Sequence, residues 1–144
     1  MTIGFRPPSR SPSLEGYVRA MSAVKKRVLV VDDDAELVES VRVALLTRGY
    51  DVSVAGDGAE ALAQIERVRP DLMLLDLVMP RRSGINVLDR MVRGTIRATP
   101  VIMMTGTDEL KHRECAALRG VSVFLSKPFP IEELLAEVDT MLKA

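Results

Sequence analysis

Five short apolar runs recur along the chain after about residue 27. They cover residues 28–34 (VLVVDDD), 50–55 (YDVSVA), 71–76 (DLMLLD), 100–105 (PVIMMT) and 121–126 (VSVFLS). Apolar runs of this length that end at polar residues are typical of strands buried on both faces of a parallel sheet. We therefore predict one strand in each run.

Between these runs, apolar residues recur every three or four positions, which indicates helices. The predicted helices cover residues 37–45, 59–66, 85–91, 110–118 and 131–142. Glycines follow three of them, at Gly49, Gly94 and Gly120, and glycine commonly ends a helix. Strand and helix thus alternate five times, as in α/β folds with right-handed crossovers. We expect a flavodoxin-like three-layer sandwich, with a five-stranded parallel sheet of order 2-1-3-4-5 and five helices.

Polar side chains that can bind ligands or take part in catalysis lie at four of the five predicted strand ends. The set consists of Asp32, Asp33 and Asp34 at the end of the first run, Asp76 and Thr105 at the ends of the third and fourth, and Lys127 directly after the fifth. In the predicted strand order these four strands are neighbours, and the second strand lies at the edge. Open α/β sheets bind ligands at the carboxyl ends of their strands, so we expect a site there.

Helix capping is an alternative explanation for part of the acidic cluster. Aspartate is a good N-cap residue and suits the first turn of a helix. Capping accounts for Asp34 and one neighbour. Three adjacent carboxylates repel one another, so a cation or a helix N-terminus must compensate them.

Phosphoryl transfer to a carboxylate is the chemistry that gives each of these residues a task. If Asp76 attacks phosphorus, a divalent cation has to neutralise the negative charge, and Mg²⁺ typically takes one or two carboxylates and several waters. We predict Asp33 and Asp76 as direct ligands, Asp32 as the residue that orients a bound water, and the backbone carbonyl of Val78 as a further oxygen ligand.

The remaining strand-end residues suit the phosphate itself. Lys127 supplies a point charge for one phosphate oxygen, and Thr105 offers a hydroxyl donor to another. Gly106 is small and leaves the approach open.

Composition limits the classes of protein that fit. The 144 residues are 47% apolar, enough for one domain with a core and a tail, and the formal net charge is zero. Residues 1–26 are basic and the rest is acidic by the same margin, which argues against nucleic-acid binding by the folded part. One cysteine, Cys115, excludes an internal disulfide and fits a reducing compartment. Without a membrane-length apolar run or a signal-peptide core, the sequence predicts a soluble, cytoplasmic protein with no membrane contact.

The first 24 residues differ in composition from the rest. They are rich in proline, serine and arginine and show no periodicity, so we predict a flexible tail over 1–24 and a folded domain over 25–144. A short docking helix over residues 14–20 is the alternative, and Met21 is a candidate alternative start.

Five segments together resemble the receiver domain of two-component response regulators. They are VLVVDDD, GDGAEAL (56–62), LLDLVMP, VIMMTG and FLSKPF, in this order, and the similarity runs from about Lys26 to Lys143. The resemblance implies that Asp76 is phosphorylated, that Asp32 and Asp33 form the acidic pair that binds Mg²⁺, and that Lys127 contacts the phosphate. It further implies that Thr105 is the switch hydroxyl, that Phe124 is the switch aromatic residue, and that a cis peptide bond precedes Pro128.

The function implied by the resemblance is a phosphorelay switch. A sensor histidine kinase or histidine phosphotransfer protein would donate the phosphoryl group, and the protein would assist only its own phosphorylation and slow dephosphorylation rather than act as an enzyme. The response would appear on the face formed by the fourth helix, the fifth strand and the fifth helix. We expect a monomer or a phosphorylation-dependent dimer without a DNA-binding or other output domain in this chain. A single-domain regulator and a receiver cut from a longer protein both fit.

Three positions depart from the common receiver pattern. Ser83 and Pro130 replace aspartates that are frequent in the family, and Val78 is apolar where some receivers carry a polar or basic side chain. An apolar Val78 cannot orient the hydrolytic water, so we expect a long-lived phosphoryl group.

Two other classes share part of the pattern. A haloacid-dehalogenase-type phosphohydrolase matches the spacing of Asp32 and Asp34, but the chain lacks room for a substrate cap. A flavin carrier would need a Ser/Thr/Gly phosphate loop after the first strand, where this chain has acids.

Overall fold

The computed structural model describes residues 14, 24–79, 83–106 and 110–142, and the predicted tail lies outside them apart from Leu14 and Val24. The order of elements is β1 (Arg27–Val31), α2 (Ala35–Thr47), β2 (Asp51–Ala55), α3 (Gly58–Val68), β3 (Leu72–Asp76), α4 (Gly84–Val92), β4 (Val101–Thr105), α5 (Leu110–Ala117), β5 (Val123–Ser126) and α6 (Ile131–Leu142).

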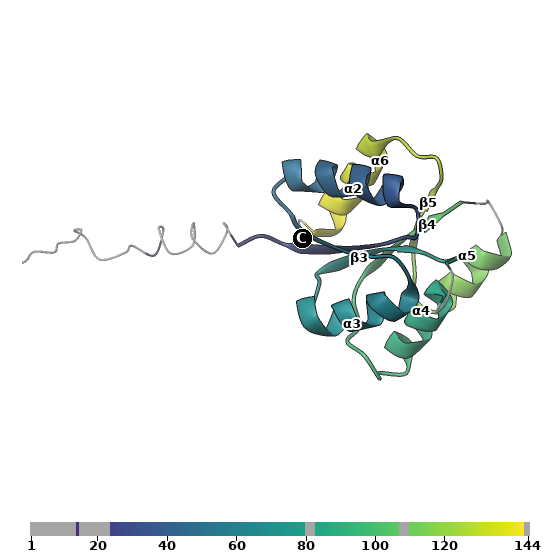
Figure 1. Ribbon diagram of the computed structural model, residues 1–144. Helices are drawn as coiled ribbons and strands as arrows, with labels where there is room; N and C mark the ends of the chain where they lie inside the picture. Colours follow the sequence, from purple (N-terminus) through teal and green to yellow (C-terminus); the bar gives the residue numbers. More distant parts are fainter. Residues whose placement is uncertain (1–13, 15–23, 80–82, 107–109, 143–144) are drawn as a thin grey trace, which may run out of the picture.

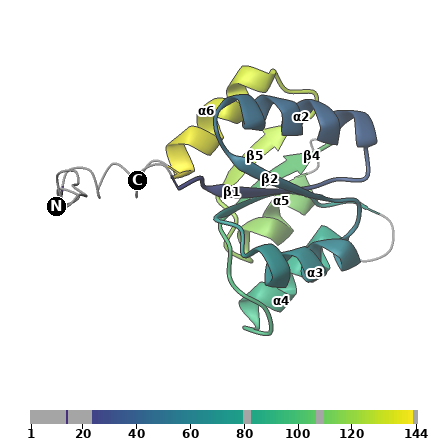
Figure 2. The same cartoon turned by 60° about the vertical axis from the view of Figure 1, so that its left-hand side comes forward.

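The five strands form one parallel sheet of order β2-β1-β3-β4-β5, and the described helices cover both of its faces. Helices α2 and α6 lie on one face, and α3, α4 and α5 lie on the other (Figures 1 and 2). The predicted three-layer flavodoxin-like fold is confirmed, including the edge position of β2 and the alternation of five strands with five helices among the described residues.

Burial of the central strands explains why their sequences are continuous apolar runs. Every residue of β3 and of β4 is buried. Their side chains alternate between the two faces, so Leu72 and Leu74 pack with α2 and α6, whereas Met73 and Leu75 pack with α3 and α4. The two apolar layers hold the sheet between the helices.

The predicted element boundaries differ from the observed ones by a few residues. The fifth strand begins at Val123 rather than at Val121, and the fourth helix ends at Ala117 rather than at residue 118. Gly120 follows with φ +95°, a backbone conformation that favours glycine, and it turns the chain from α5 toward β5. Helix α6 begins directly after Pro130, whose carbonyl accepts hydrogen bonds from Glu133 N and Leu134 N.

In the part of the chain that the structure describes, no helix has the length and apolar character needed to cross a bilayer.

Candidate functional site

Three carboxylates meet at the carboxyl edge of the sheet, as the strand order predicts. One oxygen each from Asp32, Asp33 and Asp76 can be chosen so that all lie within 4.8 Å of one another. Asp32 follows β1 directly, Asp76 is the last residue of β3, and these two strands pair side by side. Asp32 and Asp76 are buried, and Asp33 is exposed. The cluster therefore combines two shielded carboxylates with one that solvent reaches.

Both oxygens of Asp32 have hydrogen-bond partners within the protein. Oδ1 accepts the backbone N–H of Asp34 at 2.9 Å, and Oδ2 accepts Lys127 Nζ at 2.5 Å. The backbone N–H of Asp32 donates to the carbonyl of Ala55 in β2, at 3.1 Å. These bonds hold the Asp32 carboxylate in one orientation, which suits the predicted role of positioning a water rather than coordinating an ion directly.

Asp34 has a different task, and the capping explanation is correct for this residue. Its side chain is the N-cap of α2, where Oδ1 accepts the backbone N–H groups of Glu36 at 3.1 Å and Leu37 at 3.2 Å. A carboxylate committed to a helix N-terminus is poorly placed to act as a general acid. This geometry weakens the phosphohydrolase alternative, which needed Asp32 and Asp34 as a catalytic pair.

Lys127 directly follows the edge strand β5, and its side chain reaches the acidic cluster. Its ammonium nitrogen lies 2.5 Å from Asp32 Oδ2 and 3.5 Å from Asp76 Oδ2. Burial alone would lower the pKa of Lys127, but the hydrogen bond to Asp32 and the charges of Asp76 and Asp32 outweigh burial and raise it. Lys127 therefore stays charged over the physiological range and neutralises part of the acidic cluster.

The environment of Asp76 destabilises the ionised form of its carboxyl group. Burial and, secondly, the negative charge of Asp32 raise the pKa of Asp76 from 3.8 to about 6. Lys127 and a 3.2 Å hydrogen bond from the backbone N–H of Val78 to Oδ1 act in the opposite direction without cancelling the shift. A carboxylate with a raised pKa is destabilised in its ionised form, so a bound cation would relieve it.

We predict a pH-dependent stability that originates at Asp76. The folded protein binds a proton on Asp76 more tightly than the unfolded chain does. The stabilisation of the fold by this proton is therefore complete below about pH 4 and is lost as the pH rises through about 6. Asp76→Asn should therefore raise the free energy of unfolding by about 2 kcal/mol at pH 7.5 without Mg²⁺. Urea unfolding in EDTA buffers from pH 4 to 7.5 measures this. A gain from Asp76→Asn that stays the same across that range would contradict the assignment.

Gly84 supports the backbone under Asp76, a role that sequence patterns did not reveal. A Cβ atom at Gly84 would lie 2.6 Å from the backbone oxygen of Asp76 and 2.9 Å from Cα of Leu77. The N–H of Gly84 also donates to the Leu77 carbonyl at 3.0 Å. Only glycine permits this close approach, which packs the start of α4 against the end of β3. Ser83, the N-cap residue of α4, makes no side-chain capping hydrogen bond.

The strand register places Thr105 and Phe124 on the same face of the sheet. Thr105 pairs with Ser126, and Phe124 pairs with Met103, in the register of β4 and β5. Phe124 and Met103 belong to the apolar cluster beside α3 and α4, and alternation places Thr105 and Ser126 on that face too. Thr105 is buried and Phe124 is half-buried. The two residues are diagonal neighbours across adjacent strands.

The other predicted site residues lie around this edge. Val78 is 61% exposed, two residues beyond Asp76. Gly106 is exposed, and a Cβ there would be 3.9 Å from Lys127 Cδ, an ordinary contact. The Lys127–Pro128 peptide bond is cis, and the backbone N–H of Lys127 donates to the Thr105 carbonyl at 2.7 Å. The structure therefore brings the predicted site residues to the same end of the sheet, except for Phe124, which lies within β5 two residues before that end.

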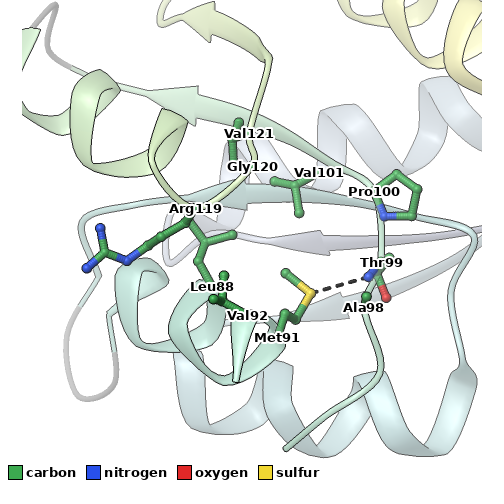
Figure 3. A pocket seen from close by; sticks show the side chains of 10 residues that line it. All are labelled: Leu88, Met91, Val92, Ala98, Thr99, Pro100, Val101, Arg119, Gly120 and Val121. Atoms are coloured by element: carbon green, nitrogen blue, oxygen red, sulfur yellow. Dashed lines mark hydrogen bonds between the residues drawn. The ribbon is translucent and has the colours of Figure 1, made fainter. Parts of the chain in front are cut away.

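A cavity of about 220 Å³ lies at the opposite end of the sheet, where α4 ends and β4 begins (Figure 3). Leu88, Met91, Val101 and Val121 give it a mainly apolar wall, and the N–H of Thr99 donates to Met91 Sδ at 3.3 Å. It contains none of the strand-end acids. The acidic cluster and this cavity are therefore separate features of the fold.

The residues present fit Mg²⁺. A hard divalent cation prefers carboxylate and carbonyl oxygens, and three carboxylates with mutually close oxygens provide them. Burial and the charge of Asp32 raise the pKa of Asp76 despite Lys127, so its ionised form leaves room for stabilisation by a cation. Asp33 and Asp76 are suited to direct contact, since Asp33 is exposed and the hydrogen bonds of Asp76, at 3.2 and 3.5 Å, are longer than those of Asp32, at 2.9 and 2.5 Å.

Comparison with known proteins agrees with the fold and the site. A family model described as the response regulator receiver domain matches residues 28–139. The chain is 41% identical over 117 residues to the response regulator MprA of Mycobacterium leprae, and 43% identical to MprA of Mycobacterium tuberculosis. These alignments cover 81% of this chain but 51% and 50% of the relatives, so the chain spans about half the length of the curated relatives it matches.

Solved receiver domains are similar in three dimensions. The receiver domain of the Francisella response regulator 1452 aligns with a TM-score of 0.75 and 33% identity, covering 83% of this chain and 98% of that one. The receiver domain of a Luxo repressor protein from Vibrio parahaemolyticus aligns with a TM-score of 0.77 and 32% identity, covering 83% and 92%. Fold, family match and identity lead to one conclusion: this chain belongs to the family of response regulator receiver domains.

Proposed function

We propose that this receiver domain accepts a phosphoryl group on Asp76 from a phosphohistidine of a sensor histidine kinase or a histidine phosphotransfer protein. The observation that carries the proposal is the position of Asp76. It is a buried carboxylate at the edge of the sheet, clustered with Asp32 and Asp33 and within 3.5 Å of the Lys127 ammonium group. No other described group of residues combines a shielded nucleophile, candidate metal ligands and a fixed cation in this way.

The transfer step needs an ionised Asp76. One of its oxygens attacks phosphorus in line, the phosphorus–nitrogen bond of the donor breaks, and the departing imidazole keeps the electron pair. With a pKa of about 6, Asp76 is mostly ionised at neutral pH, but its negative charge is poorly stabilised. Forming a bond to phosphorus relieves this charge, which favours the transfer.

Residues for the metal are Asp33 and Asp76 as direct ligands, Asp32 through a water, and the carbonyl of Val78. When bound, Mg²⁺ supplies the positive charge that offsets the negative charge gathering on the transferred group. Asp32 keeps its orientation through its bonds to Asp34 N and Lys127 Nζ.

The conformational switch after phosphorylation involves residues near Asp76. Lys127 pairs with one phosphate oxygen, and the Thr105 hydroxyl moves to donate to another. Phe124 then turns into the space that Thr105 leaves, which changes the surface formed by α5, β5 and α6. The output is a change in protein contacts, as a monomer or as a phosphorylation-dependent dimer. The domain assists its own phosphorylation and slow hydrolysis and is not a turnover enzyme.

A direct test uses acetyl phosphate as a small phosphoryl donor. With MgCl₂ the protein should gain the mass of one phosphoryl group, and with EDTA it should not. Borohydride reduction of the acyl phosphate, followed by peptide mass spectrometry, should identify residue 76 as the modified position. A label on a serine, threonine or histidine, or incorporation that does not depend on the metal, would overturn the proposal.

The lifetime of the phosphoryl group tests the role of Val78. This side chain is 61% exposed beside the site and offers no hydrogen-bonding atom to an attacking water. We expect a dephosphorylation half-life of many minutes or longer in the presence of Mg²⁺. Val78→Asn introduces a polar group and should shorten the half-life several-fold, whereas Val43→Asn, at an exposed valine of α2, should not. A wild-type half-life of seconds would contradict this expectation.

A further inference from the structure

Arg113 of α5 makes two contacts with β5 beside the proposed switch. Its Nη2 atom donates to Ser126 Oγ at 2.7 Å. Its guanidinium carbon also lies 5.4 Å from the centre of the Phe124 ring. A cation within about 6 Å of a ring centre is attracted by the electrons of the ring face. One side chain thus connects α5 to both residues on one face of β5.

These contacts place Arg113 next to the expected path of the switch. Ser126 is the register partner of Thr105, and Lys127 follows Ser126 directly in the chain. Phe124 is the half-buried ring that is proposed to turn inward when Thr105 moves toward the phosphate. Arg113 is therefore in contact with the moving ring and with the residue paired to the switch hydroxyl.

We propose that Arg113 is a positioning residue that holds Phe124 in its unphosphorylated orientation and so opposes the switch. The inference rests on the proposed function, since it adds a regulatory element to the same site. The attraction between the guanidinium group and the ring exists while the ring lies beneath the cation. It is lost when the ring turns toward Thr105, so the contact favours the unphosphorylated conformation.

The side chain is suited to this role by its chemistry. Arginine presents a planar group that can stack on a ring and donate a hydrogen bond in a fixed direction at the same time. Because the hydrogen bond to Ser126 fixes the guanidinium group to β5, the cation stays above the same strand that carries Phe124. Lysine keeps the charge but lacks this planar geometry, and methionine keeps only the length.

The test measures binding of beryllofluoride, a phosphate mimic, together with Mg²⁺ by isothermal titration calorimetry. Arg113→Met should tighten beryllofluoride binding by about threefold or more, because the switched conformation no longer competes with the cation–ring contact. Arg113→Lys should have a smaller effect in the same direction, and so should Ser126→Ala, which removes only the hydrogen bond. Arg119→Met is the matched control, because Arg119 follows the same helix but pairs with Asp89.

A double-mutant cycle separates positioning from a general structural effect. In a Phe124→Leu background, Arg113→Met should change beryllofluoride affinity much less than in the wild type, since the ring is already absent. The chain has three phenylalanines, so the aromatic NMR signals of Phe124 can be assigned by substitution, and Arg113→Met alone should shift them toward their beryllofluoride-bound positions.

The outcomes distinguish the two proposals. If the wild-type protein does not bind beryllofluoride with Mg²⁺, the proposed function fails and not merely the role of Arg113. If the wild type binds it but Arg113→Met leaves the affinity unchanged or weakens it, the positioning role is wrong. An equal gain in the Phe124→Leu background would overturn it as well.

Discussion

Asp76→Asn should reduce Mg²⁺-dependent phosphoryl incorporation from acetyl phosphate by at least about a hundredfold. The amide has the shape of the carboxylate but lacks the negative oxygen that attacks phosphorus. Since Asp76 is buried at the end of β3 and receives a hydrogen bond from Val78 N, the isosteric amide keeps its oxygen in the same place. Loss of incorporation would therefore reflect lost chemistry and not a rearranged site.

The measurement is intact-protein mass spectrometry after a timed reaction, with folding confirmed by circular dichroism. Asp51→Asn serves as the matched control, because Asp51 is an exposed aspartate at the opposite end of a strand, where β2 begins. It should be phosphorylated as fast as the wild type. Substantial incorporation in the Asp76→Asn variant would show that the nucleophile lies elsewhere.

The sequence was sufficient to predict the architecture because its apolar pattern is nearly unbroken. The strands β3 and β4 are buried on both faces, and the runs at 71–76 and 100–105 show this directly. The strand order then placed the acids at one edge. The sequence also predicted that Asp34 caps a helix, because this aspartate directly precedes one, and the structure shows this cap.

Contacts between distant side chains could not be predicted in the same way. Gly84 looks like any glycine near a helix start, and its importance depends on a 2.6 Å approach to the Asp76 backbone. Arg113 belongs to a charged helix segment, and nothing in its spacing indicates that it lies over Phe124. These features depend on how α4 and α5 pack, which local patterns do not determine.

The sequence predicted that acidic and basic groups meet at the site, but not how they pair. The sequence indicates that three acids and a lysine converge, yet it does not reveal which acid takes the lysine. The structure pairs Lys127 closely with Asp32, at 2.5 Å, and more loosely with Asp76, at 3.5 Å. Lys127 therefore compensates Asp76 less directly, and burial together with the charge of Asp32 raises the pKa of this proposed nucleophile.

The same asymmetry predicts the effect of removing the lysine. Lys127→Met should lower the free energy of unfolding by about 3 kcal/mol at pH 7.5 in EDTA, because a buried carboxylate loses its cation. Asp32 is 2% exposed, so water cannot replace the ammonium group easily. Lys127 also lowers the pKa of Asp76, so its removal should raise that pKa further. The loss of stability should therefore shrink as the pH falls toward 4 and Asp76 becomes protonated.

Magnesium should reverse much of this loss, since a divalent cation can neutralise the same oxygens. A ligand that binds only the folded state stabilises it in proportion to its affinity, and Lys127→Met removes a positive charge that repels the ion. Urea unfolding with and without excess MgCl₂ should give a larger Mg²⁺ stabilisation in Lys127→Met than in the wild type. Lys111→Met, at an exposed lysine of α5, should change neither quantity. If Mg²⁺ stabilises both proteins equally, then the ammonium group and the ion do not share the acidic cluster, and the placement of the metal among Asp32, Asp33 and Asp76 is wrong.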